Sequence, residues 1–373
     1  MTFGKAFDDI LVTRSLKLRD LAKRADISET ELRDAHAGNK ELRDDQVQRV
    51  ADELGVPIRA LYANTKLPLS KVPDFRRKKI DAGQYDRGTI AAIGFIEKIS
   101  GSLSSLPLDL GLEQAAHEKI DNLKKSTAKE LAKKWRARWG VTDSKQLDWK
   151  SSHKMYASLR GFVESLGVFV LHYSFGSDEV SGLYSKSQNG PHTILINTTC
   201  SSKARKLFTL AHEFCHVLIR KEGASNVSYA KNDVERFCNQ FAAYLLAPSS
   251  VIKAALTRYG YFPSINGDFV RLFASNLGIS QQCAVLRLVD TKHLTSTDYG
   301  AWISRFKGRT PTGDEKDPQG GQGDPLQNKR TQYGASLLKK LAEAKSGGFL
   351  DDIDIFRLAG IKPRYQRDLL GGA

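Results

Sequence analysis

The sequence predicts an α+β fold, in which a mainly helical chain carries one small antiparallel or mixed β-sheet. Apolar residues recur at helical spacing through residues 5–63. The apolar period then shortens towards two in the runs 168–171 and 193–196, with a turn signal at 188–191 between them. A strongly apolar stretch from about residue 202 to 220 follows, and its length suits a buried helix.

Residues 1–63 are expected to form an all-helical domain. Leu18 and Leu21 share one face of a helix, and Ser28 is a suitable N-cap for the helix that follows. A third helix in this segment ends at Gly55. These helices predict a helix-turn-helix arrangement.

Changes of composition predict five further segments. They are a basic linker and helical segment at residues 64–124, a compact domain with the sheet and two long helices at 125–265, a second helix-turn-helix-like region at 266–307, a disordered linker at 308–332 and a tail at 333–373.

Composition indicates a reduced, non-membrane protein with an excess of positive charge. The net charge is +15, which favours phosphate-bearing partners. Residues 1–63 hold 11 Lys and Arg against 12 Asp and Glu, whereas residues 64–160 hold 20 against 11. The four cysteines fit neither a disulfide framework nor a CxxC zinc clip. No apolar run approaches the ~20 residues of a membrane span, and no signal peptide is recognisable, so a cytoplasmic location is expected.

Two histidines four residues apart are the strongest candidates for metal binding. On a helix, His212 and His216 lie on one face, one turn apart, and two such imidazoles can bind one zinc ion at ~2.1 Å. Glu213 lies beside the first of them, where a general base is needed next to a zinc-bound water. The alternative is a chance HExxH sequence on a core helix whose histidines have other partners.

A third ligand must come from another element. The helix expected at about residues 233–246 offers Glu235, which follows His216 by 19 residues. Asp233 lies on the same helical turn, and spacing alone does not separate the two carboxylates. The alternative is a solvated carboxylate in the first turn, which the helix dipole favours.

Two separated motifs resemble the ImmA/IrrE family of zinc metallopeptidases. The motifs are Phe208-Thr209-Leu210-Ala211-His212-Glu213-Phe214-Cys215-His216 and Glu235-Arg236-Phe237-Cys238-Asn239-Gln240-Phe241-Ala242-Ala243-Tyr244-Leu245-Leu246-Ala247-Pro248. The resemblance covers roughly residues 125–305 and implies a zincin-like peptidase domain. It implies Zn2+ bound by His212, His216 and Glu235, with Glu213 as catalytic base. It also implies an endopeptidase that cleaves a helix-turn-helix transcriptional repressor in response to stress or DNA damage.

Other residues near the motifs bear on regulation and catalysis. Cys215 stands where the family usually has Gly. Cys200 could occupy the fourth zinc position and hold the enzyme latent, or it could be a small buried thiol. The strand at 193–197 could pair with an extended substrate or be an ordinary buried strand. Candidates for an oxyanion stabiliser are Tyr184, His192 and Tyr229.

Residues 18–63 resemble the Xre/Cro-type helix-turn-helix family. The resemblance is clearest in Leu21-Ala22-Lys23-Arg24-Ala25-Asp26-Ile27-Ser28 and Val50-Ala51-Asp52-Glu53-Leu54-Gly55-Val56. It places a DNA-reading helix at 28–36. Acidic residues outnumber Arg33 in that helix, so DNA binding and a docking or dimerisation role both stay open.

A basic segment further along the chain is a second candidate for nucleic-acid binding. Its cations could grip single-stranded DNA as a damage signal, with Trp135 and Trp139 stacking on bases. The alternative is a solvated basic face above core tryptophans. The cations are Lys133, Lys134, Arg136 and Arg138. A DNA-binding regulator with a structural or vestigial metal site is the alternative to the peptidase, but such a protein has little need of the non-ligand Glu213.

Overall fold

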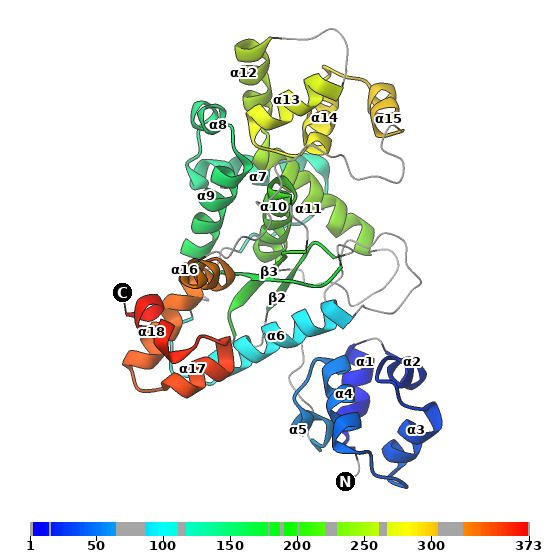
Figure 1. Ribbon diagram of the computed structural model, residues 1–373. Coiled ribbons are helices and arrows are strands. Elements are labelled where there is room, and N and C mark those ends of the chain that lie inside the picture. Colours follow the sequence, from blue (N-terminus) through cyan, green and yellow to red (C-terminus); the bar gives the residue numbers. More distant parts are fainter. Residues whose placement is uncertain are drawn as a thin grey trace. The chain divides into compact units, whose positions relative to one another are not determined.

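The computed structural model describes residues 3–14, 16–64, 87–110, 117–177, 180–186, 190–199, 202–220, 230–260, 267–304 and 324–371. They are mainly helical with one small sheet, consistent with the predicted α+β class (Figure 1). The chain divides into two compact units. The first comprises Met1–Leu112, Leu171–Thr199 and Lys329–Ala373, and the second Glu113–Val170 and Cys200–Asn328. No described helix has the length and apolar character needed to cross a bilayer.

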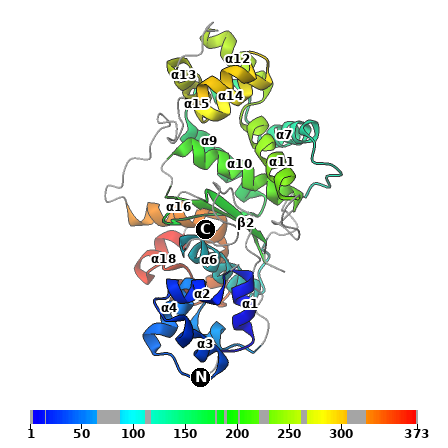
Figure 2. The ribbon, with the colours of Figure 1, turned by 90° about the vertical axis from the view of Figure 1, so that its right-hand side faces the viewer.

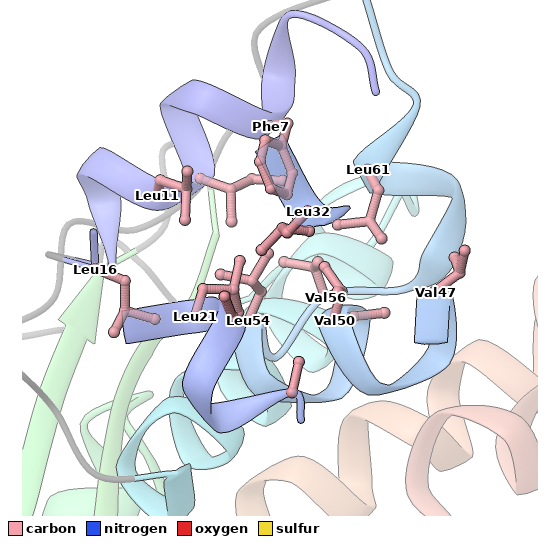
Figure 3. Packing of buried hydrophobic residues seen from close by; sticks show 14 of the residues in the cluster. Phe7, Leu11, Leu16, Leu21, Leu32, Val47, Val50, Leu54, Val56 and Leu61 are labelled. Carbon is pink, nitrogen blue, oxygen red and sulfur yellow. The ribbon is translucent and has the colours of Figure 1, made fainter. Parts of the chain in front are cut away.

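The first unit begins with five short helices around one apolar core. They are α1 (Ala6–Thr13), α2 (Leu18–Arg24), α3 (Glu29–Ala37), α4 (Asp44–Leu54) and α5 (Ile58–Leu61). Figure 3 shows Phe7, Leu32 and Leu54 converging in this core. The Ser28 side chain accepts a hydrogen bond from Glu31 N–H at 3.1 Å, which confirms the predicted N-cap of α3.

The one described sheet has three strands in the order β1-β3-β2. They are β1 (Phe169–Tyr173), β2 (Gly182–Lys186) and β3 (His192–Asn197), and β2 pairs with β3 antiparallel. Strand β2 was not predicted from the sequence, and residues 187–189, which include half of the turn predicted at 188–191, lie outside the described part of the chain. β3 is the central strand and is buried throughout, so the alternative in which it pairs with a substrate is wrong. Helix α6 (Arg87–Ser104) packs against β3.

Three helices complete the first unit at the C-terminal end of the chain. They are α16 (Pro325–Ser346), which bends at Gly334, α17 (Asp352–Ala359) and α18 (Pro363–Leu370). The prediction that 308–332 is a disordered linker is wrong from Pro325 onward, where α16 begins. Residues 305–323 lie outside the described part of the chain, as does most of the basic linker expected after residue 64.

The second unit is built from helices. They are α7 (Lys125–Trp139), α8 (Asp143–Trp149), α9 (Ser152–Ser165), α10 (Lys203–Ile219), α11 (Ala230–Leu246), α12 (Ser249–Tyr259), α13 (Gly267–Leu277), α14 (Gln281–Asp290) and α15 (Ser296–Ser304). Helix α10 packs against α9 on one side and α11 on another, and α7 packs against α11 (Figures 1 and 2). The two long helices predicted from the sequence are confirmed as α10 and α11.

A buried side-chain amide forms hydrogen bonds with the C-terminal ends of two helices in the second unit. Gln146 Nε2 donates hydrogen bonds to Leu246 O at 2.9 Å and to Leu277 O at 2.8 Å. These carbonyls lie in the last turns of α11 and α13, where no intrahelical donor is available. The C-terminal end of α11 is thereby fixed.

Candidate metal centre

Helix α10 carries both histidines of the predicted site on a buried face. Its first turn is capped by Ser202, whose side chain accepts a hydrogen bond from Arg205 N–H at 3.2 Å. All residues from 209 to 219 are buried, and His212 is only 2% and His216 only 6% exposed. Buried imidazoles need polar partners, and α11 supplies them.

Three side chains from α10 and α11 bring their metal-ligand atoms together in a small triangle, with the two oxygens of Glu235 at one corner. His212 Nε2 lies 3.2 Å from His216 Nε2 and 3.2 Å from Glu235 Oε2, and His216 Nε2 lies 3.1 Å from Glu235 Oε1. Around a tetrahedral zinc ion with bonds of about 2.0–2.1 Å, ligand atoms are about 3.3–3.4 Å apart. The observed spacing is close to this value and leaves a fourth position for water or substrate. A search of the described residues finds this one cluster of donors suited to a metal ion.

Asn239 determines which nitrogen of His212 faces the triangle. The Asn239 side-chain oxygen lies 3.0 Å from His212 Nδ1 and can accept its proton, which leaves a lone pair on Nε2. Glu235 Oε2 is then buried without a hydrogen-bond donor. A lone pair and an orphaned carboxylate oxygen facing each other are unfavourable without a cation. The residues present therefore fit a bound metal ion.

The electrostatics of the site also favour a positive charge within the triangle. Burial alone would raise the pKa of Glu235, but in the metal-free protein the protonated imidazoles of His212 and His216 hold that pKa well below its usual range. Burial disfavours the charged form of His216, whereas the Cys238 sulfur and the carboxylates of Glu235 and Glu213 raise its pKa well above the ordinary value. A divalent cation meets the same electrostatic demand as the protonated imidazole.

Glu213 is placed beside the triangle without belonging to it. It follows His212 in α10 and is 8% exposed. Its carboxylate is outside the donor cluster, yet its charge contributes to the raised pKa of His216. A carboxylate beside a metal site, but not bound to the metal, has the placement that a general base requires.

The structure separates the two carboxylates that the sequence left as alternatives. Asp233 is exposed and forms an ion pair with Arg236 at 3.2 Å, whereas Glu235 points into the triangle. Two positions along a helix differ by about 200° around its axis, so only one of the two carboxylates can face α10. Asn239 lies one turn beyond Glu235 on the same face. The sequence analysis missed its role, although this four-residue spacing was a signal for it.

The tryptophans of α7 do not offer a stacking surface for bases. Trp135 is fully buried and Trp139 is 7% exposed. The ring of Trp135 packs edge-on against Phe214 with a centroid distance of 5.3 Å, and its Nε1 donates to Glu118 Oε1 at 2.9 Å. Both tryptophans therefore belong to the core, and the predicted stacking on a single strand is wrong.

Arg136 is also a structural residue. It is buried and donates to Gln146 Oε1 at 2.6 Å and to Leu245 O at 3.2 Å. Burial lowers its pKa to about 10, so the prediction that Arg136 contacts nucleic acid is wrong. The other predicted cations are exposed, and one of them, Lys134, forms an ion pair with Glu118 at 2.8 Å. They are Lys133, Lys134 and Arg138.

The remaining candidate residues are only partly described. Tyr184 Oη and His192 Nδ1 are hydrogen-bonded to each other at 2.7 Å between β2 and β3. Cys200, the expected inhibitory ligand, and Tyr229 lie outside the described residues. Cys215, at the position where the family usually has Gly, is fully buried.

Comparisons with known proteins bear on one segment of the chain. Residues 163–288, about a third of the sequence, match the model of the Peptidase_M78 family, whose description is IrrE N-terminal-like domain. The match contains both α10 and α11 and indicates a metallopeptidase-like domain of the ImmA/IrrE type in this segment. It does not reach residues 1–63. No curated protein and no solved structure matches the chain.

Proposed function

We propose that the chain is a zinc-dependent endopeptidase in which His212, His216 and Glu235 hold the ion. The observation that carries the proposal is the triangle of donor atoms, 3.1–3.2 Å apart, on α10 and α11. When bound, zinc would polarise the scissile carbonyl and lower the pKa of a bound water to about 7.

The chain's own residues would supply orientation and proton transfer. Asn239, by accepting the His212 Nδ1 proton at 3.0 Å, keeps Nε2 free for the metal. The Glu213 carboxylate would take a proton from the attacking water and deliver it to the leaving amine. Its burial raises the free-energy cost of the charged form and so favours taking up that proton.

The proposed substrate is a helix-turn-helix transcriptional repressor, cleaved in response to stress or DNA damage. The resemblance of both motifs to the ImmA/IrrE family and the match at residues 163–288 support this choice. A peptidase that removes a repressor must be silent until a signal arrives. We propose that Cys200, 12 residues before His212 in the sequence, supplies that latency by occupying the open metal position.

The test compares new protein N-termini in host cells before and after DNA damage. Cells carry the wild type, Glu213→Gln or the control Glu130→Gln, which changes an exposed carboxylate on α7. A repressor cut that appears with the wild type and the control, but not with Glu213→Gln, supports the proposal.

Measuring the zinc content of the purified wild type and Glu213→Gln distinguishes loss of the catalytic base from loss of the metal ion. Glu213→Gln should bind as much zinc as the wild type, because Glu213 is not in the donor triangle. Equal cleavage by Glu213→Gln would contradict the proposal. In that case the alternative, a DNA-binding regulator with a structural metal site, would be preferred.

A further inference from the structure

One type of helix-to-helix turn occurs five times in the described residues. Each time, a residue with positive φ lies at the end of the first helix, a buried Ile or Val comes next, and the second helix starts after one more residue. The turns are Asp26-Ile27-Ser28, Gly55-Val56-Pro57, Gly140-Val141-Thr142, Gly278-Ile279-Ser280 and Gly360-Ile361-Lys362, with φ of 52°, 63°, 71°, 63° and 61°. The last of them, which joins α17 to α18, was not predicted from the sequence.

The second helices of these pairs carry different charges. Helix α3 begins with Glu29 and Glu31, α8 begins with Asp143, and α14 begins with two glutamines. Helix α18 instead follows Lys362 and carries Arg364 and Arg367, all exposed. Helix α5 has only four residues. Among these pairs, therefore, α18 alone presents a basic start.

The basic residues at the start of α18 oppose the usual preference of a helix. Cations near a helix N-terminus are unfavourable by about 0.3–1 kcal/mol, because the helix dipole is positive there. Helix α17 follows the usual preference, with Asp352 and Asp354 in its first turn and Arg357 in its last. Stability therefore does not explain Lys362 and Arg364, which add to the positive potential of the free N–H groups at the start of α18. Such a combination attracts phosphate. The third cation, Arg367, lies in the last turn, where the dipole favours it.

The orientation of α18 is fixed by a buried amide. Gln366 is fully buried, and its Nε2 donates to Asp352 O at 2.8 Å and to Ile361 O at 3.0 Å. Leu369 and Leu370 are buried on the same side of the helix. The opposite side is therefore held towards solvent, and Arg364 and Arg367 lie on it.

The three cations of α18 are not neutralised by neighbouring acids. Lys362, Arg364 and Arg367 form no ion pair with another described residue, and the Arg364 guanidinium lies over the ring of Tyr365 at 4.6 Å. The acidic residue of the exposed side, Asp368, is in the last turn beside Arg367, beyond Lys362 and Arg364 at the start of the helix. A basic helix start on a rigid two-helix support is complementary to the phosphates that border a DNA groove.

We propose that the α17–α18 pair binds double-stranded DNA, with the N-terminal half of α18 directed at the duplex. Charge favours DNA as the partner, because three unpaired cations complement the phosphates of a polyanion. The major groove of a duplex is also wide enough to admit an α-helix such as α18. The proposed surface shares no residue with the metal centre, and its test does not depend on peptidase activity.

The test is a fluorescence-anisotropy titration of a labelled duplex with the full-length protein at several salt concentrations. The variant Lys362→Gln/Arg364→Gln/Arg367→Gln removes three cations. Three phosphate contacts account for a salt slope of about −2.7, so the variant should bind about a hundredfold more weakly at about 150 mM salt. Its slope should be smaller by the same amount. Circular dichroism melting checks that the variant folds.

A matched control removes equal charge elsewhere. The control variant changes Lys129, Lys133 and Arg138, exposed on α7, to Gln and should bind the duplex nearly as the wild type does. Asp368→Asn removes the acid from the exposed side of α18 and should bind several-fold more tightly, a gain that misfolding cannot produce.

Three results would overturn the proposal. The control variant could lose as much affinity as the α18 variant, which would indicate binding by net charge alone. The affinity could be the same in the wild type, the α18 variant and Asp368→Asn. This result would indicate that α18 binds another partner, such as an acidic protein that contacts the exposed Ile353 and Phe356. The wild type could bind a single strand as tightly as the duplex.

Discussion

Replacement of Asn239 by Ala should weaken zinc binding without removing any metal ligand. In the wild type, His212 Nδ1 donates to the Asn239 side chain at 3.0 Å, and the His212 side chain is only 3% exposed. In Asn239→Ala, the metal-free protein can move the imidazole proton to Nε2, where Glu235 Oε2 accepts it at 3.2 Å. Zinc binding requires the proton on Nδ1, where the Asn239 acceptor is now missing.

The expected loss follows from the cost of that unpaired group. A buried polar hydrogen without a partner costs about 1–3 kcal/mol, which corresponds to a five- to 150-fold weaker affinity at about 1.4 kcal/mol per tenfold. Loss of an outer-shell partner of a zinc-bound His typically costs about 10–100-fold, and the two ranges agree. Affinity is measured by competition with a fluorescent zinc chelator, and Gln240→Ala, the adjacent half-buried amide on α11, is the control.

Two results would refute this reasoning. If Asn239→Ala binds zinc as tightly as the wild type, the hydrogen bond does not determine the tautomer of His212. If Gln240→Ala weakens binding equally, the effect comes from general disturbance of α11. Asn239→Asp should retain most of the affinity, because a carboxylate accepts the same proton.

Three other changes test the site and its support. Glu235→Gln should abolish tight zinc binding, whereas Asp233→Asn should not. The metal-free wild type should lose stability as the pH falls below about 4.3, the ordinary pKa of Glu, towards the lowered pKa of Glu235 in the folded protein. The variant Glu235→Gln should lack this pH-dependent part of the stability. Zinc titration measures the first effect, and acid unfolding measures the second. Arg136→Met should lower the unfolding free energy by about 2–4 kcal/mol, because it leaves the buried partners of Arg136 unpaired, while Lys133→Met should change it by less than about 0.5 kcal/mol in urea unfolding. Cys200→Ser should raise peptidase activity in undamaged cells, and unchanged activity would remove the proposed latency.

The helices of the candidate metal centre could be predicted because their signals are local. The spacing of His212 and His216 holds on any regular helix, and the apolar residues around them require burial. The choice between Asp233 and Glu235 as the third ligand could not be made from local signals. It depends on which side of α11 faces α10, and that packing is decided by residues distant in the sequence.

The predictions that failed concern exposure and strand pairing, which short-range patterns do not determine. Arg136 lies among exposed cations in sequence, yet it is buried because Gln146 and the end of α11 need a donor there. Strand β2 was missed because its five residues, Gly182–Lys186, include Gly, Ser and Lys and show little apolar alternation. Its pairing with β3 makes β3 central, which excludes β3 as a free edge.

The charges of the helix pairs argue for different roles at the two ends of the chain. In α3, Glu29 pairs with Arg33 and Glu31 pairs with Lys40, at 2.5 and 2.9 Å. Such a surface repels phosphate but can complement a basic or polar protein surface. Since α18 offers unpaired cations instead, the proposed DNA binding applies to the C-terminal helices, and these charges favour the predicted docking role for the N-terminal helices. If the substrate is a DNA-bound repressor, this division would bring peptidase and substrate together on one duplex, because binding at one site raises the effective concentration at the other.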